Sequence, residues 1–163
     1  MNAPQVHLML NHVPVLGILF VTIALAAGLW LRLGTLLRFA LVTLVAISLA
    51  AIPVYFSGGS SEETIEKLAG VQKSAIEQHE DVARVVSLGL GMLGLASVVA
   101  LIRYRRRAIP PALAATMLVA VVALSGALAW TAHLGGQIRH AELRGVTSAA
   151  TTPAESHRDL EPE

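Results

Sequence analysis

The fold follows from stretches such as residues 111–132, PALAATMLVAVVALSGALAWTA, in which no side chain is charged. About 20 mostly apolar residues are enough for a helix to cross the hydrocarbon core of a bilayer. Three further runs meet this condition, at residues 13–31, 39–56 and 84–102. Hydrophobic residues make up 55% of the 163-residue chain and charged residues only 14%, whereas soluble domains average about 25% charged residues. We therefore predict an all-α membrane protein with four transmembrane helices.

Basic residues are concentrated in two of the three connections between these spans. The first connection holds Arg32 and Arg38, the third holds four arginines at residues 103–107, and neither contains an acidic residue. Short basic loops stay on the cytoplasmic side of a membrane. We therefore expect both termini outside, in a cell membrane of the bacterial inner-membrane type. The short connections also predict two antiparallel hairpins that pack as a four-helix bundle.

The remaining segments divide into an outer insert and a tail. Residues 1–146 are expected to form the four-helix domain, with an insert at 57–83, and residues 147–163 a disordered polar tail. Within the insert, residues 57–61 (SGGSS) predict a flexible turn. The spacing of Ser60 and Glu63 predicts a capping box that begins a short helix near Glu62. The third membrane helix is expected to start near Gln72, beyond the bilayer.

Histidines are the best candidates for functional residues in this chain. The chain has no cysteine, so thiolate metal sites and iron–sulfur clusters are excluded. One histidine lies in the tail, and the other five are placed by the predicted topology at the outer face: His7, His12, His79, His133 and His140.

Helical spacing predicts the direction of two of these side chains. Small residues mark the faces on which membrane helices approach one another. The helical face of His79 continues through Ala83, Ser87, Gly94 and Ser97, and that of His133 through Trp130, Ala129, Gly126 and Ala123. Both histidines are therefore expected to point into the bundle.

Inward histidines on facing helices can supply both axial ligands of a b-type haem. The expected ligands are two of His12, His79, His133 and His140, with His12 and His79 first, His133 next and His7 nearby. Arginines at the same level, Arg84, Arg139 and Arg144, are expected to pair with the haem propionates. The glycines Gly135-Gly136 would either let a flat macrocycle approach or simply end the last helix. The function would be electron transfer between a membrane carrier and a periplasmic partner, and not catalysis by the protein on its own.

Three alternatives stay open on the residues alone. A quinone site would use a histidine with Glu77 or Glu80 for proton exchange. A divalent metal site would use the 79–81 cluster (His-Glu-Asp) with His133 or His12. In the third, the protein is a non-catalytic accessory or assembly subunit whose histidines are hydrogen-bonded polar groups. Nothing in the sequence indicates nucleic-acid binding, because an anionic inner leaflet explains the arginines at 103–107.

The opening stretch, residues 7–14 (HLMLNHVP), resembles the start of a widespread family of uncharacterised four-helix membrane proteins. That family begins with two histidines separated by four residues, the second followed by an apolar residue and proline. The chain is similar again in His79, before the third helix, and in the glycine-rich closing segment at 131–140. It departs from the family at Leu8, where proline is common, and in the longer closing motif. The resemblance implies haem binding or membrane redox chemistry.

Overall fold

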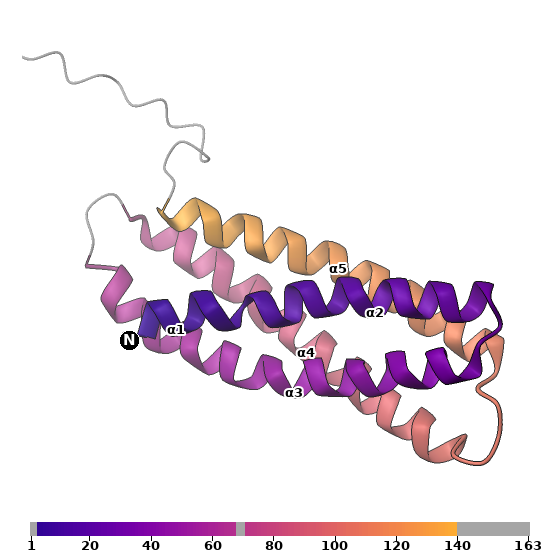
Figure 1. Ribbon diagram of the computed structural model, residues 1–163. Coiled ribbons are helices and arrows are strands. Elements are labelled where there is room, and N and C mark those ends of the chain that lie inside the picture. Colours follow the sequence, from indigo (N-terminus) through magenta and orange to yellow (C-terminus); the bar gives the residue numbers. More distant parts are fainter. Residues whose placement is uncertain (1–2, 68–70, 140–163) are drawn as a thin grey trace, which may run out of the picture.

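The computed structural model describes residues 3–67 and 71–139, which fold into helices (Figure 1). In chain order these are α1 (Ala3–Leu10), α2 (His12–Trp30), α3 (Gly34–Ile65), α4 (Lys73–Arg103) and α5 (Pro111–Arg139). The described residues contain four helical segments long and apolar enough to cross a membrane, at Pro4–Trp30, Gly34–Glu62, Lys73–Arg103 and Pro111–Ile138. The four predicted spans are therefore confirmed as helices, and α4 begins at Lys73 as expected. The predicted tail lies outside the described residues.

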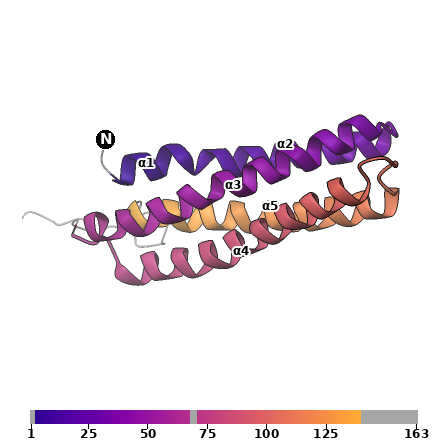
Figure 2. The ribbon, with the colours of Figure 1, turned by 90° about the horizontal axis from the view of Figure 1, so that it is seen from below.

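The helices form one elongated bundle in which consecutive long helices run in opposite directions (Figures 1 and 2). α2 and α4 each pack against both α3 and α5, and α1 lies on α3. One end of the bundle holds His7, His79 and His133 and is called the histidine end; the other holds the arginine-rich connections and is called the arginine end. There the guanidinium group of Arg38 donates to the carbonyl oxygens of Tyr104, at 2.6 Å, and Arg107, at 2.5 Å. Arg38 therefore ties α3 to the connection between α4 and α5.

The surface around the bundle is apolar. Leu16, Leu88, Met92 and Val119, one or two from each of three long helices, are each more than 60% exposed. Inside, the largest fully buried side chains come from all four long helices and are aliphatic except for Ser97; they include Ile18, Leu25, Leu41, Leu44, Leu90 and Val121. An apolar surface of this extent is unfavourable in water and favourable in lipid. The apolar surface and the lengths of the four helices are thus both consistent with a protein that spans a membrane.

Two glycine pairs expected to interrupt helices do not interrupt them. α3 continues through Gly58-Gly59 to Ile65, and α5 continues through Gly135-Gly136 to Arg139. The predicted turn at residues 57–61 and the capping box at Ser60 are therefore wrong: the Ser60 hydroxyl instead donates to the Phe56 carbonyl oxygen, one turn back. A glycine inside a helix costs about 1 kcal/mol relative to alanine. Tertiary contacts at Gly58 and Gly135, described below, offset that cost.

The first span is divided near Asn11, between α1 and α2. Pro14 lacks an N–H group, and its ring conflicts with the carbonyl group of residue 10, so the regular helical pattern cannot continue there. Beside the break, the His12 ring donates from Nδ1 to the Leu8 carbonyl oxygen at 2.7 Å. The break is therefore a local consequence of proline.

The second half of the bundle repeats the first. His79 and Gly89 follow His7 and Gly17 by 72 positions, whereas the α5 residues Pro111, Leu124, Ser125 and Gly135 follow the α3 residues Gly34, Ile47, Ser48 and Gly58 by 77 positions. The contacts repeat as well. A Cβ atom added at Gly17 would meet Ile47, and one added at Gly89 would meet Leu124.

The burial pattern supports this register. The buried α2 residues Pro14, Ile18, Leu25 and Gly28 correspond to the buried α4 residues Val86, Leu90, Ser97 and Ala100. The two offsets differ because the connection between α4 and α5 is longer than that between α2 and α3. A two-fold rotation along the bundle therefore exchanges α2 with α4 and α3 with α5.

Candidate cofactor site

His7 lies half-buried on α1 and is held by α3. Its Nδ1 is 3.1 Å from the Val54 carbonyl oxygen and 3.1 Å from the Ser57 hydroxyl oxygen. Gly58, one turn beyond Val54, leaves room for the ring: a Cβ atom there would lie 3.2 Å from His7 Cε1. A carbonyl group and a glycine four residues later thus form a notch for the imidazole.

His79 occupies an equivalent notch between α4 and α5. Its Nδ1 is 3.0 Å from the Thr131 carbonyl oxygen, and a Cβ atom at Gly135 would lie 3.2 Å from His79 Cε1. Thr131 and Gly135 stand 77 positions after Val54 and Gly58, the same offset that relates α5 to α3. The prediction that His79 points inward is confirmed, and the two notches are copies of one arrangement.

Both imidazoles lie at the histidine end, each held through Nδ1 by the helix beside it. A carbonyl oxygen can only accept a hydrogen bond, so Nδ1 carries the proton in both rings and Nε2 keeps a lone pair in the neutral form. A hydrogen bond from Nδ1 to a backbone carbonyl is the usual support of a metal-bound histidine, because it fixes the tautomer and the ring orientation. The structure therefore presents two oriented imidazoles, one from each half of the bundle, and each has an Nε2 lone pair that could bind a metal ion.

The other histidines lie elsewhere. His12 is exposed and its ring bonds back to Leu8 of α1, so the counterpart of His79 in the repeat is His7 and not His12. His133 is also exposed: its Nε2 is 2.9 Å from Gln137 Nε2, and its ring lies against Trp130. The prediction that His133 points into the bundle is wrong. His140 lies outside the described residues, as does Arg144, and the Arg139 side chain is not described.

The stripe of small residues behind His133 gave the wrong direction because it faces outward. Ala123, Gly126 and Ala129 are all exposed, and a Cβ atom at Gly126 would meet nothing within 4 Å. The signal that would have found His7 is the repeat, since His7 and His79 share a position in it and each faces a Gly-Gly pair on the next helix.

Carboxylates and Arg84 surround the histidine pair without joining it. Glu80 is half-buried near Glu62 of α3, whereas Glu77 is exposed. Arg84 is exposed, and its guanidinium group lies 3.7 Å from the Asp81 carboxylate. Among residues 3–67 and 71–139, no three histidine or carboxylate side chains come together as a group that could hold a metal ion. The metal interpretation of residues 79–81 thus gains no support.

Comparison with known proteins adds no relative. No protein-family model matches the chain, and no curated protein and no solved structure matches it. The resemblance of residues 7–14 to a family of four-helix membrane proteins therefore stays a prediction, and the function has to be argued from the site.

Proposed function

We propose that the protein is a small electron-transfer subunit of a cell membrane that holds one b-type haem between His7 and His79. The observation that carries the proposal is the repeated notch, which offers two imidazoles with Nδ1 bonded to a carbonyl oxygen and Nε2 left to donate. His7 and His79 would hold the haem iron through their Nε2 atoms. When bound, the haem would supply one-electron redox chemistry, and the notches would fix the orientation of its ligands.

Each structural feature of the notches serves such a role. The carbonyl group of Val54 or Thr131 orients one ring and increases the basicity of its Nε2. The glycine one turn later lets the ring lie against the helix backbone, where a side chain would displace it. The apolar bundle below excludes water from one side of the site. Nothing in this arrangement requires a bound substrate, so we propose electron transfer and not catalysis by the chain alone.

The visible spectrum of the full chain, purified in mild detergent from cells with an adequate haem supply, tests the proposal. We expect the oxidised and dithionite-reduced spectra of a low-spin haem. His7→Ala and His79→Ala should each lower the bound haem about tenfold or more, because each removes an axial ligand. His12→Ala and His133→Ala, at exposed histidines, are the matched controls and should retain the colour.

A colourless wild-type protein would refute haem binding, and unchanged spectra in His7→Ala and His79→Ala would refute the ligand assignment. Size-exclusion profiles of each variant separate loss of haem from loss of fold. If the protein binds no haem and the variants stay folded, the rival function is that of a non-catalytic accessory subunit whose histidines only join the helices.

We further propose that the histidine end faces the outside and the arginine end the cytoplasm, because the short connections at the arginine end carry basic and no acidic residues. The absence of cysteine makes this testable by single substitution. In intact cells, Ser60→Cys should react with a membrane-impermeant maleimide, whereas Arg106→Cys should react only after the membrane is opened. The opposite pattern would reverse the orientation and put the haem site at the cytoplasmic face.

A further inference from the structure

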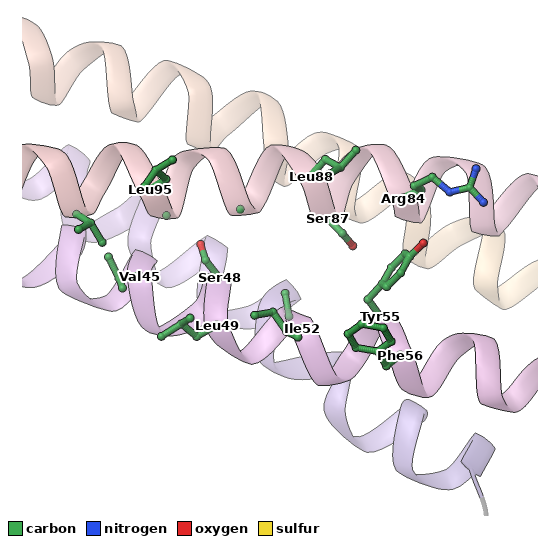
Figure 3. Close-up of a pocket in the computed structure, with 14 residues that line it drawn as sticks. Val45, Ser48, Leu49, Ile52, Tyr55, Phe56, Arg84, Ser87, Leu88 and Leu95 are labelled. Carbon is green, nitrogen blue, oxygen red and sulfur yellow. The ribbon is translucent and has the colours of Figure 1, made fainter.

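A groove of about 520 Å³ runs along the bundle between α3 and α4, and nothing said so far uses it (Figure 3). Its walls are aliphatic over most of the length, from Val45 and Val98 toward the arginine end to Tyr55 and Phe56 near the histidine end. Along α4 it extends from Arg84 to Val98, about 21 Å at 1.5 Å per residue. This volume is typical of ligand sites, which measure about 300–1,000 Å³.

The groove exists because α4 carries glycine where the other half of the bundle carries larger residues. At Gly91 a Cβ atom would meet nothing within 4 Å, and Gly94 lies directly against Ser48. The repeat places Leu19 and Thr22 at the equivalent positions of α2. The aromatic wall formed by Tyr55 and Phe56 is also absent from the other half of the repeat, where the equivalent α5 residues are Ala132 and His133. The fold does not by itself require the groove.

Most of the polar groups lie at the end nearest the histidines; the Ser48 hydroxyl, farther along, donates to backbone carbonyl oxygens. The Tyr55 hydroxyl points toward the Arg84 side chain, and Ser87 points its hydroxyl into the groove from α4 (Figure 3). Asp81, 3.7 Å from Arg84, offsets the positive charge. The groove therefore ends in hydrogen-bond donors whose net charge is close to zero.

We propose that this groove binds an isoprenoid quinone, with its ring at Tyr55, Arg84 and Ser87 and its apolar tail along Gly91 and Gly94. A quinone ring is neutral and presents carbonyl oxygens, which need donors. An anionic phospholipid would need a net positive site, yet Asp81, Glu80, Glu77 and Glu62 surround this end of α4 and α3. A water-soluble ligand would leave most of the apolar length unfilled.

The site also lies where a carrier for the histidine pair would be needed. Tyr55 directly follows Val54, whose carbonyl group holds His7. Arg84 is five residues beyond His79 on α4, a rise of about 7.5 Å. Binding of the quinone is argued from the groove alone; its role as the membrane electron carrier rests on the proposed function.

The full chain in nanodiscs of zwitterionic phosphatidylcholine, titrated with a decyl-substituted benzoquinone, tests the proposal. We expect about one bound quinone per chain. Gly91→Leu, which gives α4 the residue of its α2 equivalent, should raise the Kd about tenfold or more. Arg84→Gln should raise it less, because Tyr55 and Ser87 remain as donors. Gly126→Leu, at an exposed glycine of α5 that touches nothing, is the matched control and should bind as the wild type does.

Organic extracts of protein purified from native membranes give the second measurement. Quinone should accompany the wild type and Gly126→Leu and be depleted about tenfold in Gly91→Leu. Failure of the wild type to bind the benzoquinone, equal binding by Gly91→Leu, or phospholipid as the sole occupant would each overturn the proposal. Neither measurement requires haem, so a colourless protein that binds quinone rejects the haem and keeps the groove, and the reverse result rejects the groove alone.

Discussion

The two interfaces that join the helix pairs, α3 with α4 and α2 with α5, are built from equivalent positions and differ at their centre, where α4 has Gly94 and α2 has Thr22. Between α3 and α4, the Ser48 hydroxyl donates directly to the Leu90 carbonyl oxygen at 2.8 Å, because Gly94 has no side chain to intervene. Between α2 and α5, Thr22 occupies the place of Gly94. Its hydroxyl donates to the Ile18 carbonyl oxygen at 2.8 Å and meets the Ser125 hydroxyl at 3.3 Å.

This difference shows how one scaffold serves two purposes. One interface is direct, with a glycine at the contact and a second glycine, Gly91, opening the groove above it. In the other interface, the Thr22 hydroxyl lies between the serine hydroxyl and the backbone carbonyl group that correspond to those of Ser48 and Leu90. This interface also has Leu19 in place of Gly91. Small residues let membrane helices approach closely, so the glycines both tighten α3 against α4 and leave the groove that we assign to a quinone.

The histidine notches show the opposite behaviour, since they are alike in both halves. Each uses a carbonyl group and a glycine one turn later. The distance from Nδ1 to the carbonyl oxygen is 3.1 Å for His7 and 3.0 Å for His79. The two halves of the bundle are therefore alike at the notches, where we propose two equivalent haem ligands. They differ at the groove, which is lined by α3 and α4 and for which we propose a single quinone.

Filling a notch should give the largest effect. In Gly58→Leu and Gly135→Leu the new side chain would displace the imidazole, because a Cβ atom alone already lies 3.2 Å from Cε1. We expect bound haem to fall about tenfold or more in each variant, while helix propensity improves and the fold persists. The reduced-minus-oxidised spectrum measures the loss.

Gly59→Leu is the control, because a Cβ atom at Gly59 would meet nothing within 4 Å, and it should keep its haem. Loss in only one of the two notch variants would break the equivalence of the notches and indicate a single histidine ligand.

Exchanging the interface residues should give a smaller effect. Gly94→Thr places a side chain against Ser48 and separates α3 from α4, at a cost of about 1–3 kcal/mol in the free energy of unfolding. Thr22→Gly loses the hydroxyl contact to Ser125 and adds a helix glycine, at a cost of about 1 kcal/mol. The midpoints of SDS-induced unfolding of the two variants measure the difference. Equal midpoints, or a less stable Thr22→Gly, would show that the two interfaces do not differ as described.

Much of the fold could be predicted from the sequence, and the site only in part. The uncharged runs indicate four helices, because backbone groups in lipid have to be satisfied within the helix. The inward direction of His79 follows from helical spacing. His133 defeats the same argument, since the small residues behind it face outward. A stripe of small residues permits an interface but does not create one.

What the sequence determined by itself is local: which segments are apolar enough to cross a membrane, where Pro14 breaks the first helix, and that one end of the bundle carries the histidines. What only the tertiary structure decided is how the helices face one another. Packing of α1 on α3 gives His7, and not His12, a notch equivalent to that of His79, and the imidazoles lie against Gly58 and Gly135 inside helices that continue past these glycines. The physical reason is that a glycine is unfavourable in a helix alone and favourable where another residue needs the space of its missing side chain.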